Sequence, residues 1–109
     1  SFFEQKGNKE KAIEFYNKTL NFKPDYVDAL FNLGAIYYNE GTSILKISKT
    51  KKEKKKAIEK YKKARPYFES VHRLDSSDKT TVKLLIGIYS VLEENEKKEE
   101  MEKKLGDLQ

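Results

Sequence analysis

The residues that most often perform chemistry are few in this chain and form no catalytic pattern. Its 109 residues include a single histidine, His72, and no cysteine. A metal site or a nucleophile–base pair needs several such groups at fixed spacing, and there is no glycine-rich phosphate loop. Carboxylates are abundant, but they alternate with lysines at a spacing of four residues, which is typical of a solvated helix face. The sequence therefore predicts no enzyme activity, no cofactor and no metal site.

A second chemical feature is the basic segment from Lys46 to Arg65. It holds eleven basic and two acidic residues, while the whole chain has a net charge of +5, so the remainder is mildly acidic. The run from Lys49 to Lys56 lacks arginine and interleaved aromatic residues, which makes nucleic acid an unfavoured partner. Two interpretations stay open. The run is either a soluble hairpin tip or a basic arm that contacts an acidic surface: nucleic acid, phospholipid or an acidic protein.

The elements that position these groups are predicted to be helices. Between Val27 and Gly41, apolar residues recur at three- and four-residue spacing, which predicts a helix with one buried face. Asp25 is the predicted N-cap of this helix, and Pro24 ends the helix before it. Gly34 lies inside the helix and predicts the close approach of another helix backbone. The apolar stripe consists of Leu30, Leu33, Ile36 and Tyr37.

The chain contains an internal repeat at an offset of 52 residues. The aligned pairs are chemically similar: Ala12 and Ala64, Phe15 and Tyr67, Tyr16 and Phe68, Thr19 and Val71, Phe22 and Leu74, Leu30 and Val82, Leu33 and Leu85, Ile36 and Ile88, and Tyr37 and Tyr89. So many matches at one offset indicate a duplicated helical unit. At this offset His72 aligns with Leu20, so we expect the histidine to occupy an ordinary structural position.

This pattern resembles the tetratricopeptide (TPR) repeat, a family of paired antiparallel helices. The resemblance rests on Leu33-Gly34-x-x-Tyr37, with Ala12-x-x-x-Tyr16 before it. It implies an all-α fold, a right-handed superhelix built from antiparallel helix pairs. The offset of 52 residues exceeds the family's period of 34 residues by 18, so the second repeat is expected to carry 18 extra residues.

The expected organisation is one TPR-like domain. It comprises a partial first repeat (1–26), a second repeat with the 18-residue extension (27–78), and a third repeat with a capping helix (79–109). No stretch approaches the roughly 18–20 apolar residues of a membrane span. The absence of cysteine excludes disulfides but does not decide the compartment.

The chain is expected to begin midway through a helix, as a fragment whose own start is missing. Residues 1–6 would form the last turns of that helix, and Gly7-Asn8 would form the turn to a helix over residues 9–22. Phe2 and Phe3 are expected to pack onto this next helix. An apolar edge near Phe2, Phe3 and Phe15 would then permit self-association as a homodimer.

The 18 extra residues are predicted to lengthen both helices of the second repeat. Apolar residues continue at helical spacing on both sides of the insertion: Ile44, Leu45 and Ile47 before it, and Ala57, Ile58 and Tyr61 after it. An antiparallel hairpin with a turn near residues 48–52 would bring the two sets face to face. A solvated loop is the alternative. Pro66 predicts a kink in the returning helix.

The TPR resemblance implies a concave groove that binds a peptide or a partner protein. The predicted partner-binding residues lie off the core stripe of two helices: Asp28, Phe31, Asn32, Ala35, Tyr38 and Asn39 on the central helix, and Lys83, Leu84 and Gly87 on a helix over about 78–93. Phe31 and Tyr38 are aromatic residues of the type that often dominates binding energy, and the repeat core does not require them. The alternative is that a further N-terminal helix or the hairpin arm covers them.

Some TPR proteins hold a C-terminal carboxylate with asparagines, lysines and an arginine. Asn32 matches the asparagine of the middle repeat, but Thr80 and Leu84 stand where a lysine and an arginine are needed. This carboxylate clamp is therefore not predicted. The predicted function is a non-catalytic protein–protein interaction module, with the basic arm and self-association as alternatives.

Overall fold

The computed structural model describes residues 2–109, with side chains from residue 7 onward. In this part of the chain there are five helices and no strand: α1 (Phe2–Phe22), α2 (Val27–Ile47), α3 (Lys51–Leu74), α4 (Lys79–Val91) and α5 (Asn95–Leu108). Helices hold 85% of the residues. The all-α fold predicted from the sequence is confirmed.

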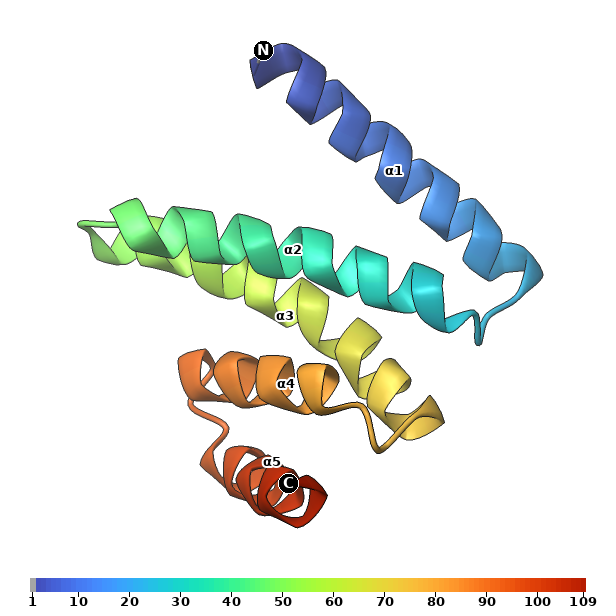
Figure 1. Ribbon diagram of the computed structural model, residues 1–109. Coiled ribbons are helices and arrows are strands. Elements are labelled where there is room, and N and C mark those ends of the chain that lie inside the picture. The colour runs from blue at the N-terminus through green and yellow to red at the C-terminus, as the bar shows by residue number, and fades with distance from the viewer. Residues whose placement is uncertain (1) are drawn as a thin grey trace.

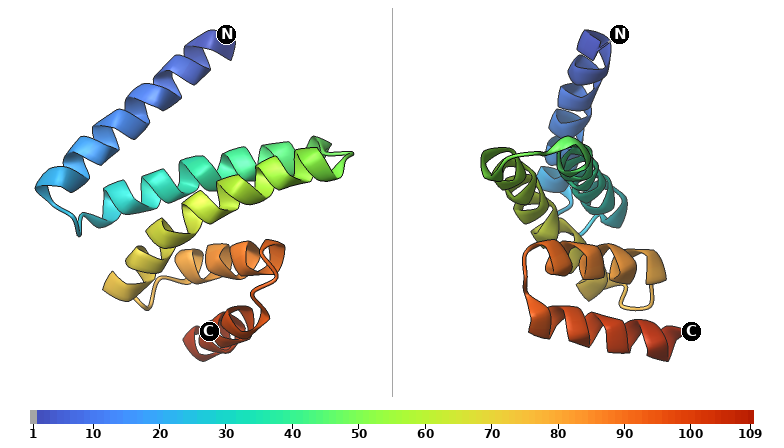
Figure 2. Two further views of the ribbon diagram at one scale, coloured as in Figure 1. Left: turned by 180° about the vertical axis from the view of Figure 1, so that it is seen from behind. Right: turned by 90° about the vertical axis from the view of Figure 1, so that its left-hand side faces the viewer.

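Successive helices stack into an open solenoid of antiparallel neighbours (Figure 1). α2 and α3 lie side by side along most of their length, α4 packs against α3, and α5 packs against α4. α1 contacts α2 but diverges from it with distance from their connecting turn, and both views of Figure 2 show its N-terminal end away from the other helices. The solenoid is therefore closed around α3 and open beside α1.

The hydrophobic core lies where α2, α3 and α4 meet. Its buried side chains come from one face of each helix: Leu30 and Leu33 from α2, Ala64, Phe68 and Val71 from α3, and Val82, Leu85 and Ile88 from α4. These residues recur at three- and four-residue spacing within each helix, as the apolar stripe predicts. Burial of each larger side chain stabilises the fold by about 1.5–3 kcal/mol.

Two glycines of α2 allow aromatic rings of α3 to approach. A Cβ atom placed on Gly34 would lie 2.9 Å from Cζ of Phe68, and one on Gly41 would lie 3.0 Å from Cε2 of Tyr61. The two contacts are seven residues apart on each helix, which is about two turns. The same packing therefore repeats along the hairpin. The three nearest atoms to a Cβ on Gly34 belong to the Phe68 ring and not, as predicted, to a helix backbone. At Gly41 a backbone atom, the carbonyl oxygen of Ala57, is among the three nearest, at 3.2 Å.

The segment between α2 and α3 is a turn of residues 48–50, so the two helices form the predicted hairpin. Thr50 caps α3 by accepting a hydrogen bond from the backbone N–H of Glu53 at 3.1 Å. The Glu53 carboxylate in turn accepts from the backbone N–H of Lys49 at 3.2 Å, one residue before the N-cap, so the arrangement is a variant of the capping box. The alternative of a solvated loop is therefore wrong. The assignment of this hairpin to an enlarged second repeat stays an interpretation.

The predicted apolar seam of the hairpin is only partly correct. Tyr61 is buried, and its hydroxyl lies 2.8 Å from the Thr42 hydroxyl in a hydrogen bond. Leu45 and Ile47, by contrast, are 36% and 75% exposed. In the register set by the two glycine contacts, the residues opposite Ile47 are the lysines of residues 54–56, which offer no apolar partner.

α1 runs without a break from Phe2 to Phe22, so the predicted turn at Gly7-Asn8 is wrong. Gly7 does not adopt the positive φ that ends many helices, and nothing lies within 4 Å of a Cβ placed on it. A glycine in a helical conformation costs about 1 kcal/mol relative to alanine but does not stop the helix. The predicted packing of Phe2 and Phe3 concerns side chains outside the described residues.

The predicted N-cap of the central helix is also wrong. α2 begins after Tyr26, whose side chain makes no capping hydrogen bond. Asp25 lies in the preceding turn, which is closed by the backbone N–H of Tyr26 donating to the carbonyl oxygen of Lys23 at 3.1 Å. At the corresponding turn before α4, Asp78 is a true N-cap and accepts from the backbone N–H of Thr80 at 3.1 Å.

Pro66 lies inside α3, as the sequence places it. The helix continues through the proline, and its second half turns away from α2 toward α4 (Figure 1). A proline has no backbone N–H to donate and its ring crowds the preceding turn, so a change of direction is expected here. The bend allows one helix to pack against α2 with its first part and against α4 with its last part.

Candidate interaction site

An open hollow of about 290 Å³ lies between the first turns of α2 and α4. Three of the predicted binding residues, Asp28, Phe31 and Asn32, line it from α2. Thr80 lines it from α4, beside the N-cap Asp78. Residues from two helices, separated by almost 50 positions in the sequence, thus meet at one surface.

The charged residues that line this α2/α4 hollow are both acidic. Asp28 is exposed, and Asp78 adds a second carboxylate that accepts hydrogen bonds from the backbone N–H of Thr80 and from the Thr81 hydroxyl at 2.8 Å. No lysine or arginine is among the described residues that line the hollow. A peptide C-terminus would therefore meet two negative charges in this hollow. Complementary charge favours a basic or amide-rich ligand instead.

Phe31 and Tyr38 belong to the core and do not stand clear of it. The ring of Phe31 meets the ring of Phe68 edge-on with a centroid separation of 5.3 Å, and Tyr38 meets Tyr61 in the same way at 5.3 Å. Both side chains are partly buried against the core cluster, and burial raises the pKa of Tyr38. The prediction that the core does not require them is wrong, because α3 covers one side of each ring.

Ala35 and Asn39 lie at a second open hollow, of about 460 Å³, between α1 and α2. Its described lining comes equally from the two helices: Asn8, Lys9, Ala12 and Tyr16 from α1, and Asn32, Ala35, Ile36 and Asn39 from α2. Asn32 is thus shared by the two hollows. The contributions of α1 were not among the predicted site residues, although the 52-residue offset already aligned Ala12 and Tyr16 with the core residues Ala64 and Phe68.

The predicted binding residues on α4 do not form a common surface with those on α2. Lys83 is exposed on the helix surface, while Leu84 is partly buried against the core cluster. A Cβ placed on Gly87 would lie 3.2 Å from the hydroxyl oxygen of Tyr38, so this glycine serves close packing between α4 and α2. None of these three residues lines either hollow. The residue of α4 that lines the α2/α4 hollow is Thr80.

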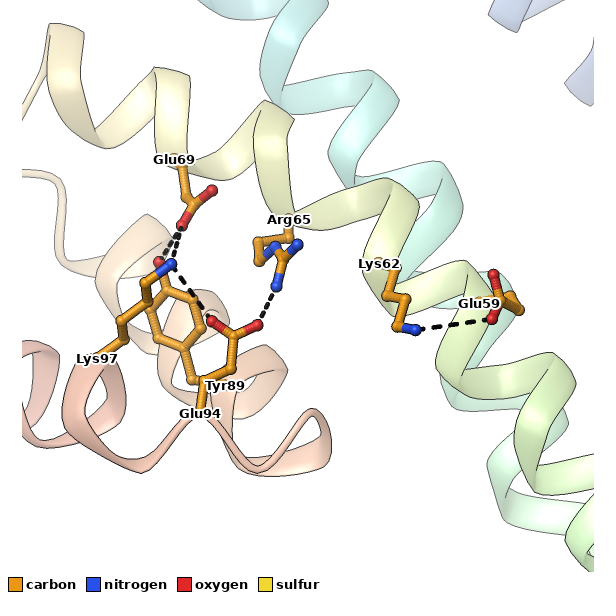
Figure 3. Close-up of polar contacts among 7 residues, drawn as sticks. All are labelled: Glu59, Lys62, Arg65, Glu69, Tyr89, Glu94 and Lys97. Carbon is orange, nitrogen blue, oxygen red and sulfur yellow. Dashed lines mark hydrogen bonds and ion pairs between the residues drawn. The ribbon is translucent and has the colours of Figure 1, made fainter.

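A polar network joins α3 to α4 and α5 on another surface (Figure 3). The Tyr89 hydroxyl donates to Oε2 of Glu69 at 2.6 Å, Arg65 pairs with Glu94, and Nζ of Lys97 lies 3.3 Å from Oε2 of Glu94. Burial, followed by the hydrogen bond to the Glu69 carboxylate, raises the pKa of Tyr89. The hydroxyl is therefore held in its protonated, donating form, which fits a structural cross-link between helices.

The remaining chemical groups do not assemble into a reactive centre. His72 is partly buried, and its Nδ1 atom has no hydrogen-bond partner among the described residues. Across the same residues no group of three or more histidine or carboxylate side chains is placed to hold a metal ion. None of the described helices combines the length and apolar character needed to cross a membrane.

The basic segment forms the tip of the α2–α3 hairpin. Its exposed lysines are Lys46, Lys49, Lys51, Lys52, Lys54, Lys55 and Lys56. Within the described part of the chain, no carboxylate lies within 4 Å of the ammonium groups of these lysines. The tip and the acidic α2/α4 hollow are at opposite ends of α2, so the molecule has separate basic and acidic surfaces.

Comparison with known families bears on these surfaces. Residues 3–41 match the family model described as TPR repeat. The matched span includes α1 from residue 3 and α2 up to Gly41, and therefore both helices that line the larger hollow. No curated protein matches the chain.

Proposed function

We propose that this chain, which is a TPR repeat protein, binds a peptide or a partner protein in the hollow between α2 and α4 and performs no catalysis itself. TPR repeats generally mediate protein–protein interaction, and the family is typically non-catalytic. The observation that carries the proposal is the meeting of Asp28, Phe31 and Asn32 with Thr80 at one open hollow. Four side chains with different chemistry, presented by two helices of a rigid stack, favour selective recognition.

The chemistry of the hollow defines its ligand. The part of the Phe31 ring that Phe68 does not cover offers an apolar contact. The side-chain amide of Asn32 both donates and accepts hydrogen bonds, as a peptide backbone requires. Asp28 and Asp78 favour a lysine or arginine side chain on the ligand. A short basic peptide segment with one apolar residue meets all three conditions.

A phage-display selection tests this proposal: the wild-type chain is used to select peptides from a random library. Peptides enriched on the wild-type chain should bind the Asp28→Lys variant at least about tenfold more weakly, because the charge of a residue that lines the hollow is reversed. Asp25→Lys is the matched control, since Asp25 is exposed in the turn before α2 and does not line the hollow. Phe31→Ala is a poor probe because it also removes a core contact. Enriched peptides that bind the wild-type chain, the Asp28→Lys variant and the Asp25→Lys variant equally would contradict the proposal.

A second candidate function is supported by the hairpin tip. Its lysines are exposed and, among the described residues, no carboxylate lies within 4 Å of their ammonium groups, so the tip is available as a basic arm for an acidic surface. Vesicles containing phosphatidylserine provide the probe, with neutral phosphatidylcholine vesicles as the control. Binding through the tip should fall steeply with salt and should be lost when Lys51, Lys52, Lys54 and Lys55 are changed to glutamine. Binding that survives these substitutions would exclude the arm as the contact.

A further inference from the structure

The tip of the α2–α3 hairpin carries an apolar side chain that the fold leaves uncovered. Ile47 is the last residue of α2 and is 75% exposed, more than any other large aliphatic residue in the described part of the chain. Single exposed apolar residues are common on protein surfaces and by themselves indicate nothing. What distinguishes Ile47 is the charge around it and its place at the end of a projecting element.

The residues around Ile47 are strongly basic. Residues 46–56 contain seven lysines and one carboxylate, Glu53, which gives a local charge of +6. The lysines are exposed, and among the described residues no carboxylate lies within 4 Å of their ammonium groups. Glu53 is held within the turn, where it accepts hydrogen bonds from the Thr50 hydroxyl and from the backbone N–H of Lys49, each at 3.2 Å. The tip therefore combines an uncovered apolar side chain with uncompensated positive charge.

The position of the tip makes it accessible to a large flat surface. In Figure 1 the turn between α2 and α3 extends past the ends of α4 and α5, and the left view of Figure 2 shows the same projection from behind. The right view of Figure 2 looks onto this end of the molecule, where the turn is not covered by another helix. A planar surface can therefore meet the tip without meeting the other helices first.

We propose that the hairpin tip binds an anionic lipid bilayer, with its lysines among the headgroups and Ile47 inserted at the boundary with the acyl chains. The inference rests on the basic arm that is the second candidate function, and it identifies the acidic surface as a membrane. Anionic lipids attract basic segments, and an apolar side chain beside those charges gains burial just beneath the headgroups. The long apolar stems of lysines allow their ammonium groups to stay in water while Ile47 inserts.

A nucleic acid is a less suitable partner for this tip. It supplies negative charge but no apolar layer for an aliphatic side chain. Residues 46–56 contain no arginine for bidentate phosphate contacts and no aromatic residue on which a base could stack. A bilayer that contains anionic lipid matches both the charge of the tip and the exposure of Ile47.

A single tryptophan reports directly on insertion. The chain contains no tryptophan, so Ile47→Trp introduces the only one. With vesicles that contain phosphatidylserine, its fluorescence should shift to shorter wavelength and should be quenched by lipids brominated on their acyl chains. Phe22→Trp is the matched control, because Phe22 is 94% exposed at the end of α1, away from the tip. A tryptophan there should show neither change.

Removal of the apolar side chain separates insertion from attraction by charge. Ile47→Ser should weaken binding to phosphatidylserine vesicles about tenfold without changing its salt dependence, because it removes an apolar contact and no charge. The thermal melt should be unchanged, since Ile47 is already exposed. Leu74→Ser makes a similar change at the opposite end of α3, where Leu74 is 46% exposed, and should bind vesicles like the wild-type chain.

The results that would overturn insertion differ from those that would overturn the basic arm. Salt-sensitive vesicle binding that is equal in the wild-type chain and Ile47→Ser, with no quenching of the tryptophan at position 47, would exclude insertion and leave the arm in place. Absence of vesicle binding at about 0.1 M salt would exclude both. Tighter binding to duplex DNA or to polyglutamate than to the vesicles would exclude a membrane as the acidic surface. None of these results depends on the phage selection, which tests the α2/α4 hollow.

Discussion

α3 and α1 carry the same pattern of small and aromatic residues but differ in what covers it. On α3 the pattern is sealed by α2 and contributes to the core; on α1 the corresponding residues border an open hollow. A helical repeat pattern defines a face that needs a partner, and the arrangement of the other helices determines whether that partner is already present. The comparison indicates that the α3 face contributes to the stability of the core, whereas the corresponding face of α1 stays open at a hollow.

Truncation of the two equivalent aromatic residues should give the largest contrast. Phe68→Ala removes a fully buried ring and should lower the free energy of unfolding by about 3–5 kcal/mol. Tyr16→Ala removes a partly exposed ring and should cost less than about 1.5 kcal/mol, because solvent already reaches it. Urea unfolding followed by circular dichroism measures both. Equal losses would mean that the α1 face is as closed as the α3 face.

Substitution of one glycine on α2 and one on α1 tests the same difference between the packed α2/α3 contact and the open α1. Gly34→Leu should overpack the contact with Phe68 and lower the free energy of unfolding by about 1–3 kcal/mol. Gly7→Ala should instead raise it by about 0.5–1 kcal/mol, because Gly7 is helical and an added Cβ meets no side chain or other helix within 4 Å. Thermal melts of the two variants give the sign of each change. A neutral Gly34→Leu variant would show that α2 and α3 pack less closely than described.

The hydrogen bond at the hairpin arm should have a smaller effect. Tyr61→Phe removes the hydroxyl that pairs with Thr42 and should cost about 0.5–1.5 kcal/mol in urea unfolding. Tyr26→Phe is the matched control, because Tyr26 is 41% exposed, and its change should stay within about 0.5 kcal/mol. Indistinguishable variants would place the Tyr61 hydroxyl in solvent and the arm away from α2.

The polar network at Tyr89 should make the free energy of unfolding sensitive to alkaline pH. In the folded chain burial and the Glu69 carboxylate raise the pKa of Tyr89 above its ordinary value of 10.0. The stabilisation is therefore fully present below pH 10.0 and is lost as the pH rises above it, since only the unfolded chain then releases the proton readily. Urea unfolding between about pH 8 and pH 11 should show this decline. Tyr89→Phe should reduce the decline, and an unchanged pH profile would contradict the assigned environment.

Much of the fold could be predicted from periodicity alone. The spacing of Leu30, Leu33 and Ile36 predicts α2, and the continuation of apolar residues past Gly41 predicts the hairpin, because both signals depend only on local sequence. The predicted break at Gly7 failed for a physical reason. A glycine permits a helix to end but does not require it, and its φ angle is decided by the structure around it.

The site was harder to predict because burial depends on contacts between distant segments. Phe31 and Tyr38 lie off the main apolar stripe, and only the position of the Phe68 and Tyr61 rings makes them core residues. Conversely, Ala12 and Tyr16 have the pattern of core residues, and only the divergence of α1 from α2 leaves them at a hollow. Periodicity identifies faces, whereas it does not identify the helix that covers each face.

The reaction rates of two engineered thiols test the central difference between α1 and α3 most directly. The chain contains no cysteine, so Ala12→Cys and Ala64→Cys each introduce the only thiol. With an aromatic disulfide reagent under native conditions, the thiol at position 12 should react about 100-fold or more faster than the thiol at position 64, which becomes accessible only when the core opens. Equal protection of the two thiols would contradict the account, because the face of α1 would then be covered as completely as that of α3.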